Sequence, residues 1–117
     1  MELSQIINSL VSEIKLTEIQ SKIFLHIVIN GKMNASKLSS DLNITLNEAI
    51  SNSRKLVDLG GFIDMPNDEF ETMHPRFTAV NMYRRMCERE QITFKKNLKV
   101  DNIGVVLERS YDAARTK

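Results

Sequence analysis

Polar side chains within residues 46–59 are the first candidates for chemistry in this sequence. Helical spacing puts one set on a single face: Asn47, Ser51, Asn52, Arg54, Lys55 and Asp58. Amide and hydroxyl groups pair with base edges, an arginine reaches guanine or a phosphate, and a lysine reaches a phosphate. A solvated helix face accounts for the same residues without any ligand. With two positive charges, this set alone would give modest affinity for DNA.

The sequence carries no signature of a catalytic or metal site. His26, His74 and the single Cys87 have no metal-ligand spacing. A Gly-Lys-Ser/Thr nucleotide loop, a Gly-rich dinucleotide fingerprint and a Gly-x-Ser-x-Gly elbow are all absent. We interpret His74 as a helix-cap neighbour of Pro75 and Cys87 as an inert core residue, with a redox role for Cys87 at a dimer seam as the alternative. We therefore expect no enzyme activity, no metal and no cofactor.

Length and composition are those of an ordinary globular domain. The 117 residues, 42% hydrophobic and 26% charged, suit one domain with one core. One cysteine excludes an internal disulfide framework and is compatible with a reducing cytosol. No apolar run approaches the roughly 18–20 residues that span a bilayer, and Glu2 stands where a signal peptide carries positive charge. The sequence predicts a single domain over 1–117, cytoplasmic and not bound to a membrane.

The net charge of +1 conceals a division between the two parts of the chain. Residues 1–75 carry six basic and ten acidic side chains, whereas residues 76–117 carry ten basic and five acidic ones. Attraction to DNA phosphates should therefore come largely from the second part. Arg84 and Arg85 leave the apolar face of their helix, so they could neutralise phosphates beside a reading helix; a plain solvated surface is the alternative. The other basic residues of this part that could contribute are Arg76, Arg89, Lys95, Lys96 and Lys99.

Two helices are expected before residue 31. Apolar residues at spacings of three and four predict an amphipathic helix over 1–15, packed either on its own domain or on a second subunit. Thr17 and Gln20 have the spacing of a capping box, which starts a mostly buried helix that ends at Asn30 and Gly31. The run "IFLHIVI" could also form a buried strand, but the cap and the length favour a helix.

A short helix, a turn and a longer helix are expected next. Residues 35–42 have an apolar face, and Asn43 suits the following turn because asparagine tolerates a left-handed backbone. Thr45 and Glu48 repeat the capping-box spacing and start the helix over 46–59. This is the helix whose polar face could read bases.

A hairpin with an acidic tip follows in "FIDMPNDEFETM". Pro66 and Asn67 predict the turn between two short strands. Its carboxylates would be repelled by a phosphate backbone, so we expect the hairpin to stay out of the minor groove. It would point away from DNA or meet a basic surface on a protein partner through Asp64, Asp68 and Glu69.

The remaining residues, 75–117, are expected to form helices that dimerise. Pro75 is preorganised for the first position of a helix. The wide apolar arc that follows, from Phe77 to Cys87, favours contact with a second chain. After an irregular stretch, a last helix is expected from about Asp101, frayed at its end.

The order helix, helix, turn, helix and two-stranded wing is that of a winged helix-turn-helix. Within it, "LTEIQSKIFLHIVINGKMNASKLSSDLNITLNEAISNSRKLVDLGGFI" resembles the DNA-binding domain of the TrmB-like archaeal transcriptional regulators. The resemblance covers roughly residues 15–90 and rests on Leu16, Thr17, Gly31, Leu38, Ile44, the 56–59 segment, Gly61, Phe62, Ile63 and "FETMHP". Many such regulators add a C-terminal sugar-binding domain, which this chain is too short to contain, so sugar sensing is not implied.

The resemblance and the residues together give one preferred hypothesis and one alternative. The preferred fold is mainly α with a small β-hairpin, a winged helix-turn-helix over 16–74 with additional N- and C-terminal helices. The preferred function is a homodimeric, sequence-specific transcription regulator that binds double-stranded DNA. Residues expected to contact DNA are Thr45, Asn47, Ser51, Asn52, Arg54, Lys55, Arg84 and Arg85. The alternative is a winged-helix module that docks on transcription or chromatin proteins without reading sequence.

Overall fold

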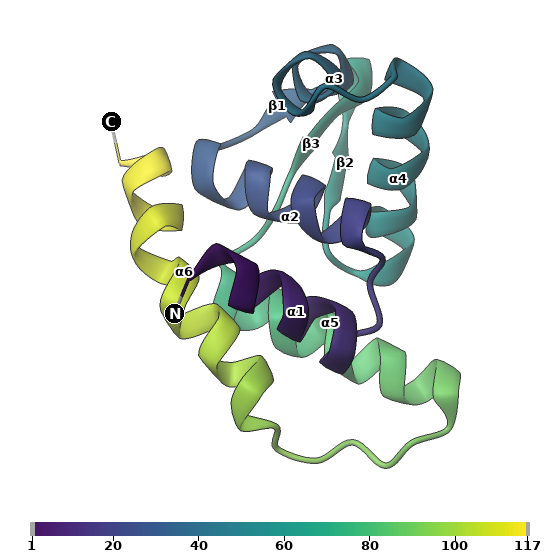
Figure 1. The fold of residues 1–117 in the computed structure, drawn as a ribbon, viewed down its shortest axis with the longest axis vertical. Helices are drawn as coiled ribbons and strands as arrows, with labels where there is room; N and C mark the ends of the chain where they lie inside the picture. Colours follow the sequence, from purple (N-terminus) through teal and green to yellow (C-terminus); the bar gives the residue numbers. More distant parts are fainter. Residues whose placement is uncertain (1, 117) are drawn as a thin grey trace.

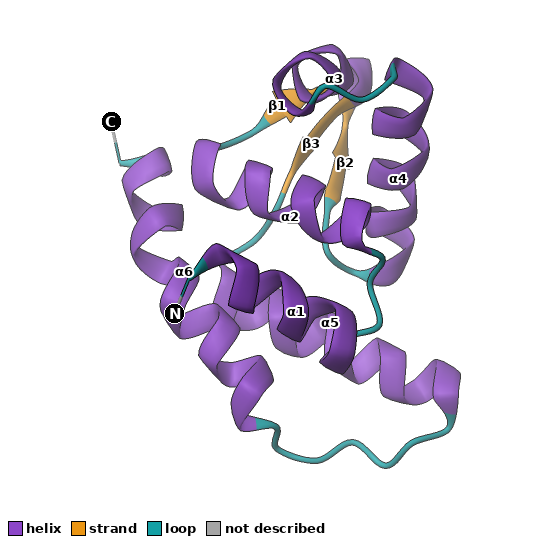
Figure 2. Cartoon of the chain, in the orientation of Figure 1, coloured by secondary structure: helices purple, strands orange, loops and turns teal. Residues whose placement is uncertain are grey.

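The computed structural model describes residues 2–116 of the chain. Within that range it has six α-helices and one three-stranded antiparallel sheet (Figures 1 and 2). The helices are α1 (Leu3–Glu13), α2 (Glu18–Asn30), α3 (Ala35–Leu42), α4 (Leu46–Leu59), α5 (Pro75–Glu90) and α6 (Leu98–Arg115). The predicted mainly α fold with a small hairpin is confirmed. None of the described helices combines the length and the apolar character needed to cross a bilayer.

The predicted capping boxes both form and fix the starts of two helices. Thr17 Oγ1 accepts from Gln20 N at 3.1 Å, and Gln20 Oε1 accepts from Thr17 N at 3.0 Å. Thr45 and Glu48 make the same reciprocal pair at 3.0 and 2.9 Å. Each box satisfies two backbone groups at a helix end, which explains why α2 and α4 begin at the expected residues. The helix prediction for "IFLHIVI" is confirmed.

The sheet contains one strand more than the predicted hairpin. Strands β2 (Ile63–Met65) and β3 (Glu69–Glu71) form the hairpin, joined by a single 3-10 turn over Pro66–Asp68. Strand β1 (Met33–Asn34) pairs with the other side of β3, so the order is β1-β3-β2. A two-residue strand has too few residues for an alternating pattern, and for this reason the sequence did not reveal it.

A single apolar cluster joins the helices to the sheet. Phe62 stacks between Phe24 of α2 and Phe70 of β3, with ring centroids 6.2 and 6.0 Å apart. Ile6 and Leu10 bury the inner side of α1 in the same cluster. The stripe of α1 therefore packs on its own chain, which is one of the two expected arrangements. In Figure 1, α2 crosses the middle of the molecule, with α4 at one edge and α6 at the opposite edge.

Helices α5 and α6 differ from the sequence predictions in three respects. The apolar arc of α5 is covered mostly within the chain, since Met82, Met86 and Cys87 are buried, so its width did not require a second chain. Helix α6 begins at Leu98, three residues before the predicted start, because Asn97 Oδ1 accepts from the Lys99 and Val100 amides. The predicted fraying of its end is wrong: the last helical residue is anchored by several hydrogen bonds.

Two carboxylates outside the candidate interface, Glu13 and Asp41, should make the folded chain less stable at acid pH than at neutral pH. The hydrogen bond from Asn97 lowers the pKa of Glu13, and contact with His26 lowers the pKa of Asp41. A lowered pKa adds stability above the ordinary values of 4.5 and 3.8, and this contribution is lost as pH falls through the folded-state pKa.

We expect the free energy of unfolding of the unaltered chain to fall between neutral pH and about pH 3. In the double variant Glu13→Gln, Asp41→Asn it should fall by a smaller amount. Urea titrations across this range measure the difference. Parallel pH profiles for the two proteins would contradict the assignment.

Candidate nucleic-acid interface

The turn between α3 and α4 sets the direction of the candidate helix. Asn43 adopts the expected left-handed conformation, with φ of 54°, and Ser39 Oγ donates to the Ile44 carbonyl at 2.6 Å. Beyond the turn, Ala49, Ser53 and Leu56 bury one side of α4. Because that side is fixed in the core, the opposite side of α4 must face solvent.

The exposed side of α4 holds most of the predicted contact residues. Asn47, Ser51, Arg54 and Lys55 are exposed, as is the capping residue Thr45 at the start of the helix. The spacing of Asn47, Ser51, Arg54 and Lys55 brings them to one face about two helical turns long. This face offers amide, hydroxyl, guanidinium and ammonium groups without a neighbouring apolar cover.

Asn52 is less available than its position in the sequence suggests. Its side chain is half-buried, and Nδ2 donates to the Glu48 carbonyl at 2.8 Å within α4. One amide hydrogen is therefore used inside the helix, while Oδ1 has no partner among residues 2–116. Asn47 and Ser51 are the better placed polar groups for a ligand.

The hairpin tip contacts the exposed face of α4. Arg54 Nη2 lies 3.1 Å from Asp68 Oδ1, and the two side chains are 63% and 49% exposed. We expected the acidic tip to point away or to meet a partner's basic surface, yet the basic group it meets belongs to this chain. The pair joins positions fourteen residues apart, and no local spacing signals such a contact.

Of the two arginines of α5 predicted to contact DNA, Arg85 lies against the C-terminal end of α4, whereas Arg84 contacts residues of its own helix. Arg85 Nη1 donates to the Asp58 carbonyl at 3.2 Å, which places a positive charge against the last turn of α4. Arg84 Nη2 donates to Asn81 Oδ1 at 2.8 Å, and its Nη1 lies 3.8 Å from a Glu88 carboxylate oxygen. The structure therefore brings Arg85 to α4 but directs Arg84 along α5.

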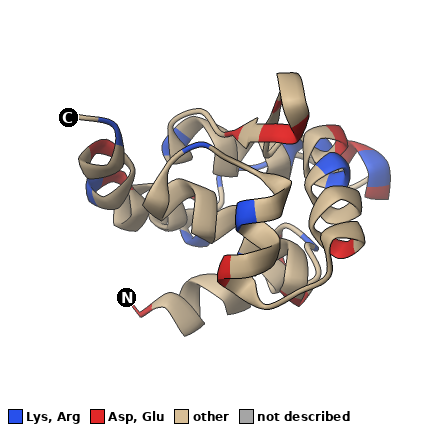
Figure 3. Cartoon of the chain, turned by 90° about the horizontal axis from the view of Figure 1, so that it is seen from above, with Lys and Arg blue, Asp and Glu red and all other residues tan. Residues whose placement is uncertain are grey.

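Folding mixes the charges that the sequence separates. Lys99 lies 4.0 Å from a Glu13 carboxylate, and Arg115 pairs with Glu71, so basic groups of the second part meet acidic groups of the first. Figure 3 shows basic and acidic residues interspersed in the view from above. The described part of the chain thus supplies local basic groups near α4 instead of one broad basic face.

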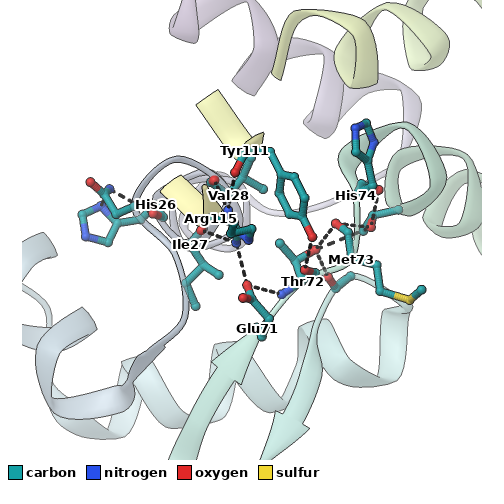
Figure 4. Close-up of polar contacts among 12 residues, drawn as sticks. His26, Ile27, Val28, Glu71, Thr72, Met73, His74, Tyr111 and Arg115 are labelled. Carbon is teal, nitrogen blue, oxygen red and sulfur yellow. Dashed lines mark hydrogen bonds and ion pairs between the residues drawn. The ribbon is translucent and has the colours of Figure 1, made fainter. Parts of the chain in front are cut away.

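One group of side chains within residues 2–116 has the composition of a metal site. His74, Glu108 and Asp112 offer ligand atoms within 4.8 Å of one another. The His74 ring is already engaged, because Nδ1 accepts from the Arg76 amide at 3.1 Å and Nε2 faces Glu108 at 3.5 Å. A neutral ring that accepts at Nδ1 carries its proton on Nε2, so metal binding there would have to break the helix cap. Figure 4 shows His74 beside Tyr111, consistent with a structural role.

The other residues weighed for metal or redox chemistry lie apart. His26 Nε2 is 2.8 Å from Asp41 Oδ2, on the α2 side of the molecule, and Cys87 is buried in α5.

Comparisons of the sequence and structure with protein-family models, curated proteins and solved structures give no match.

Proposed function

We propose that this chain is a cytoplasmic, homodimeric transcription regulator that binds specific sequences of double-stranded DNA through a winged helix-turn-helix. Helix α3, the turn at Asn43 and helix α4 would form the helix-turn-helix, and β2 with β3 would form the wing. Helix α4 would lie in the major groove as the recognition helix. The proposal agrees with the resemblance of residues 15–90 to TrmB-like archaeal regulators.

The observation that carries the proposal is the uncovered polar face of α4. Asn47, Ser51, Arg54 and Lys55 are all exposed on it, while the other side of the helix is fixed in the core by the turn after α3. A helix held in this way can enter a groove about 12 Å wide with its polar groups against base edges. Arg85, beside the last turn, would lie near the phosphate backbone.

Apolar side chains left uncovered on the terminal helices support dimerisation. Leu98 and Val105 of α6 are 72% and 49% exposed, and Leu3 of α1 and Phe77 of α5 are 52% and 53% exposed. A two-fold dimer through such surfaces would present two copies of α4 to neighbouring major grooves, about one DNA turn apart.

Replacing Arg54 by glutamine is the direct test of DNA reading. Gel shifts on genomic fragments should show specific complexes with the unaltered chain. Arg54→Gln together with Asn47→Ala should weaken them by about tenfold or more, the effect of losing a base contact of about 1–3 kcal/mol. Arg109→Gln is the matched control, because Arg109 is an exposed arginine of α6, at the opposite edge of the molecule from α4 (Figure 1). Sedimentation of the complex should give two chains per duplex. Absence of binding by the unaltered chain at low salt would rule out the proposal.

A protein-docking module is the second candidate function, favoured by a groove beside the hairpin. The groove has a volume of about 290 Å³, and its lining includes Ile63, Met73 and Phe77. These three side chains are 43–53% exposed, and Thr78, Asn81 and Arg85 add polar groups to the lining. Exposed apolar residues gathered within a polar rim are typical of protein-binding surfaces. Loss of partner binding in Phe77→Ser, with no DNA complex formed by the unaltered chain, would favour this candidate.

A further inference from the structure

The ion pair between α4 and the hairpin links a candidate DNA-reading side chain to a carboxylate. Arg54 of α4 and Asp68 of the turn come from different elements, with 3.1 Å between Nη2 and Oδ1. Asn67 and Asp68 both adopt left-handed backbone conformations, with φ of 65° and 55°. Asparagine and aspartate are the residues other than glycine that tolerate this conformation best. The residue types therefore suit the conformation of this turn, in which the Asp68 carboxylate lies beside Arg54 of α4.

A phosphate and a base edge respond differently to this carboxylate. A phosphate approaching Arg54 would bring a second negative charge within a few ångströms of Asp68, and like charges at such a distance repel. Guanine O6 and N7 are acceptors with only partial negative charge, so Asp68 repels them far less than it repels a phosphate. The guanidinium has five N–H donors in a planar fork, and the contact with Asp68 occupies only one side of it. Arg54 therefore keeps donors for a guanine edge while becoming a poor partner for phosphates.

We infer that Asp68 is a specificity-determining residue of the proposed DNA interface. It reserves the Arg54 guanidinium for a guanine in the major groove and reduces the binding of Arg54 to the phosphates of any sequence. The inference rests on the proposed function and deepens it, because it names the base that α4 reads and the residue that enforces the choice. The acidic hairpin thereby gains a role in selecting sequence, one that a general repulsion of DNA would not give it.

Asp64 supplies a matched control for this role. It is an exposed aspartate of β2 in the same hairpin, and it makes no ion pair among residues 2–116. Asp64→Asn and Asp68→Asn remove the same charge from the same hairpin, but only Asp68→Asn releases Arg54. A difference between the two variants therefore reports the contact with Arg54 and not the net charge.

The experiment compares dissociation constants for specific and random DNA. Duplexes are selected from a random library with the unaltered chain. Affinity is then measured at one salt concentration for the selected duplex, for the same duplex with 7-deazaguanine at each guanine in turn, and for a scrambled duplex. Asp68→Asn should tighten binding to the scrambled duplex by about two- to fivefold more than Asp64→Asn does, the factor that an exposed ion pair supplies. It should also reduce the penalty for 7-deazaguanine at one position.

The Arg54→Gln background completes the test. In the Arg54→Gln variant, Asp68→Asn should change the affinity for the scrambled duplex by the same factor as Asp64→Asn does, because no guanidinium is left to release. Equal effects of the two variants in the unaltered background, or an unchanged preference for guanine in Asp68→Asn, would overturn the inference while leaving the proposed function standing. An unaltered chain that selects no sequence would refute both.

Discussion

Replacing Gly104 by valine is expected to cost about 3 kcal/mol of unfolding free energy, at the upper end of the range for overpacked cores. Gly104 lies in the middle of α6, where a Cβ would come within 2.5 Å of Arg76 Cα and 3.0 Å of Arg76 N. Those atoms belong to the backbone of α5, so no side-chain rotation can relieve the contact. The two helices would have to separate, and the buried neighbours Val100, Ile103 and Leu107 would lose packing.

The alanine variant makes the prediction sharper, because propensity and packing act in opposite directions. Glycine in a helix interior costs about 1 kcal/mol relative to alanine, so Gly104→Ala would stabilise an isolated helix. Here we expect it to destabilise the chain by about 1–2 kcal/mol, less than the valine variant does. Asn102→Ala, at an exposed position of α6, serves as control and should stay within about 0.5 kcal/mol of the unaltered chain. Urea denaturation measures all three, and an alanine variant more stable than the unaltered chain would contradict the close approach of α5 and α6.

Elements specified by short-range signals could be predicted from the sequence. The capping boxes at Thr17 and Thr45 each act over three residues, and the left-handed turn at Asn43 depends on a single side chain. Such signals depend little on the rest of the fold, which is why the bounds of α2 and α4 were predicted to within a residue or two. The polar face of α4 followed from the same periodicity.

Contacts between distant segments could not be predicted in this way. The pairing of Arg54 with Asp68 depends on how the hairpin packs against α4, and the close approach at Gly104 depends on where α5 lies. In each case the residue type has many ordinary explanations, and only the fold selects one. The acidic hairpin shows the consequence: its charge predicts that it avoids DNA, whereas the structure pairs one of its carboxylates, Asp68, with Arg54 of α4. The start of α6 at Leu98 differs from the prediction for a simpler reason: its cap, Asn97, lies in a segment whose pattern indicates irregular structure.

Replacing Arg115 by methionine is expected to lower the free energy of unfolding by about 3 kcal/mol, because it breaks a largely buried ion pair. Arg115 ends α6 and pairs with Glu71 of β3; the two side chains are only 18% and 24% exposed. Its guanidinium also donates to the carbonyls of Val28 at 2.9 Å and Ile27 at 3.1 Å, near the C-terminal end of α2. Figure 4 shows these contacts converging from three elements. The positive charge of Arg115 at this end of α2 also interacts favourably with the negative end of the helix dipole.

The expected loss comes mainly from what the substitution leaves behind. Methionine keeps much of the apolar volume of Arg115 but leaves the Glu71 carboxylate without its cation and the Val28 carbonyl without a donor. Arg115→Lys restores a positive charge, but a single ammonium group cannot reach all three acceptors. Its free energy of unfolding should therefore lie between those of the unaltered chain and Arg115→Met. Combining Arg115→Met with Glu71→Gln should recover part of the stability, since no unpaired charge remains. Arg109→Met, at an exposed position of the same helix, should change the unfolding free energy by less than about 0.5 kcal/mol. If the double variant proved less stable than Arg115→Met alone, the stranded charge would not be the cause, and the carbonyl contacts to α2 would have to account for the effect.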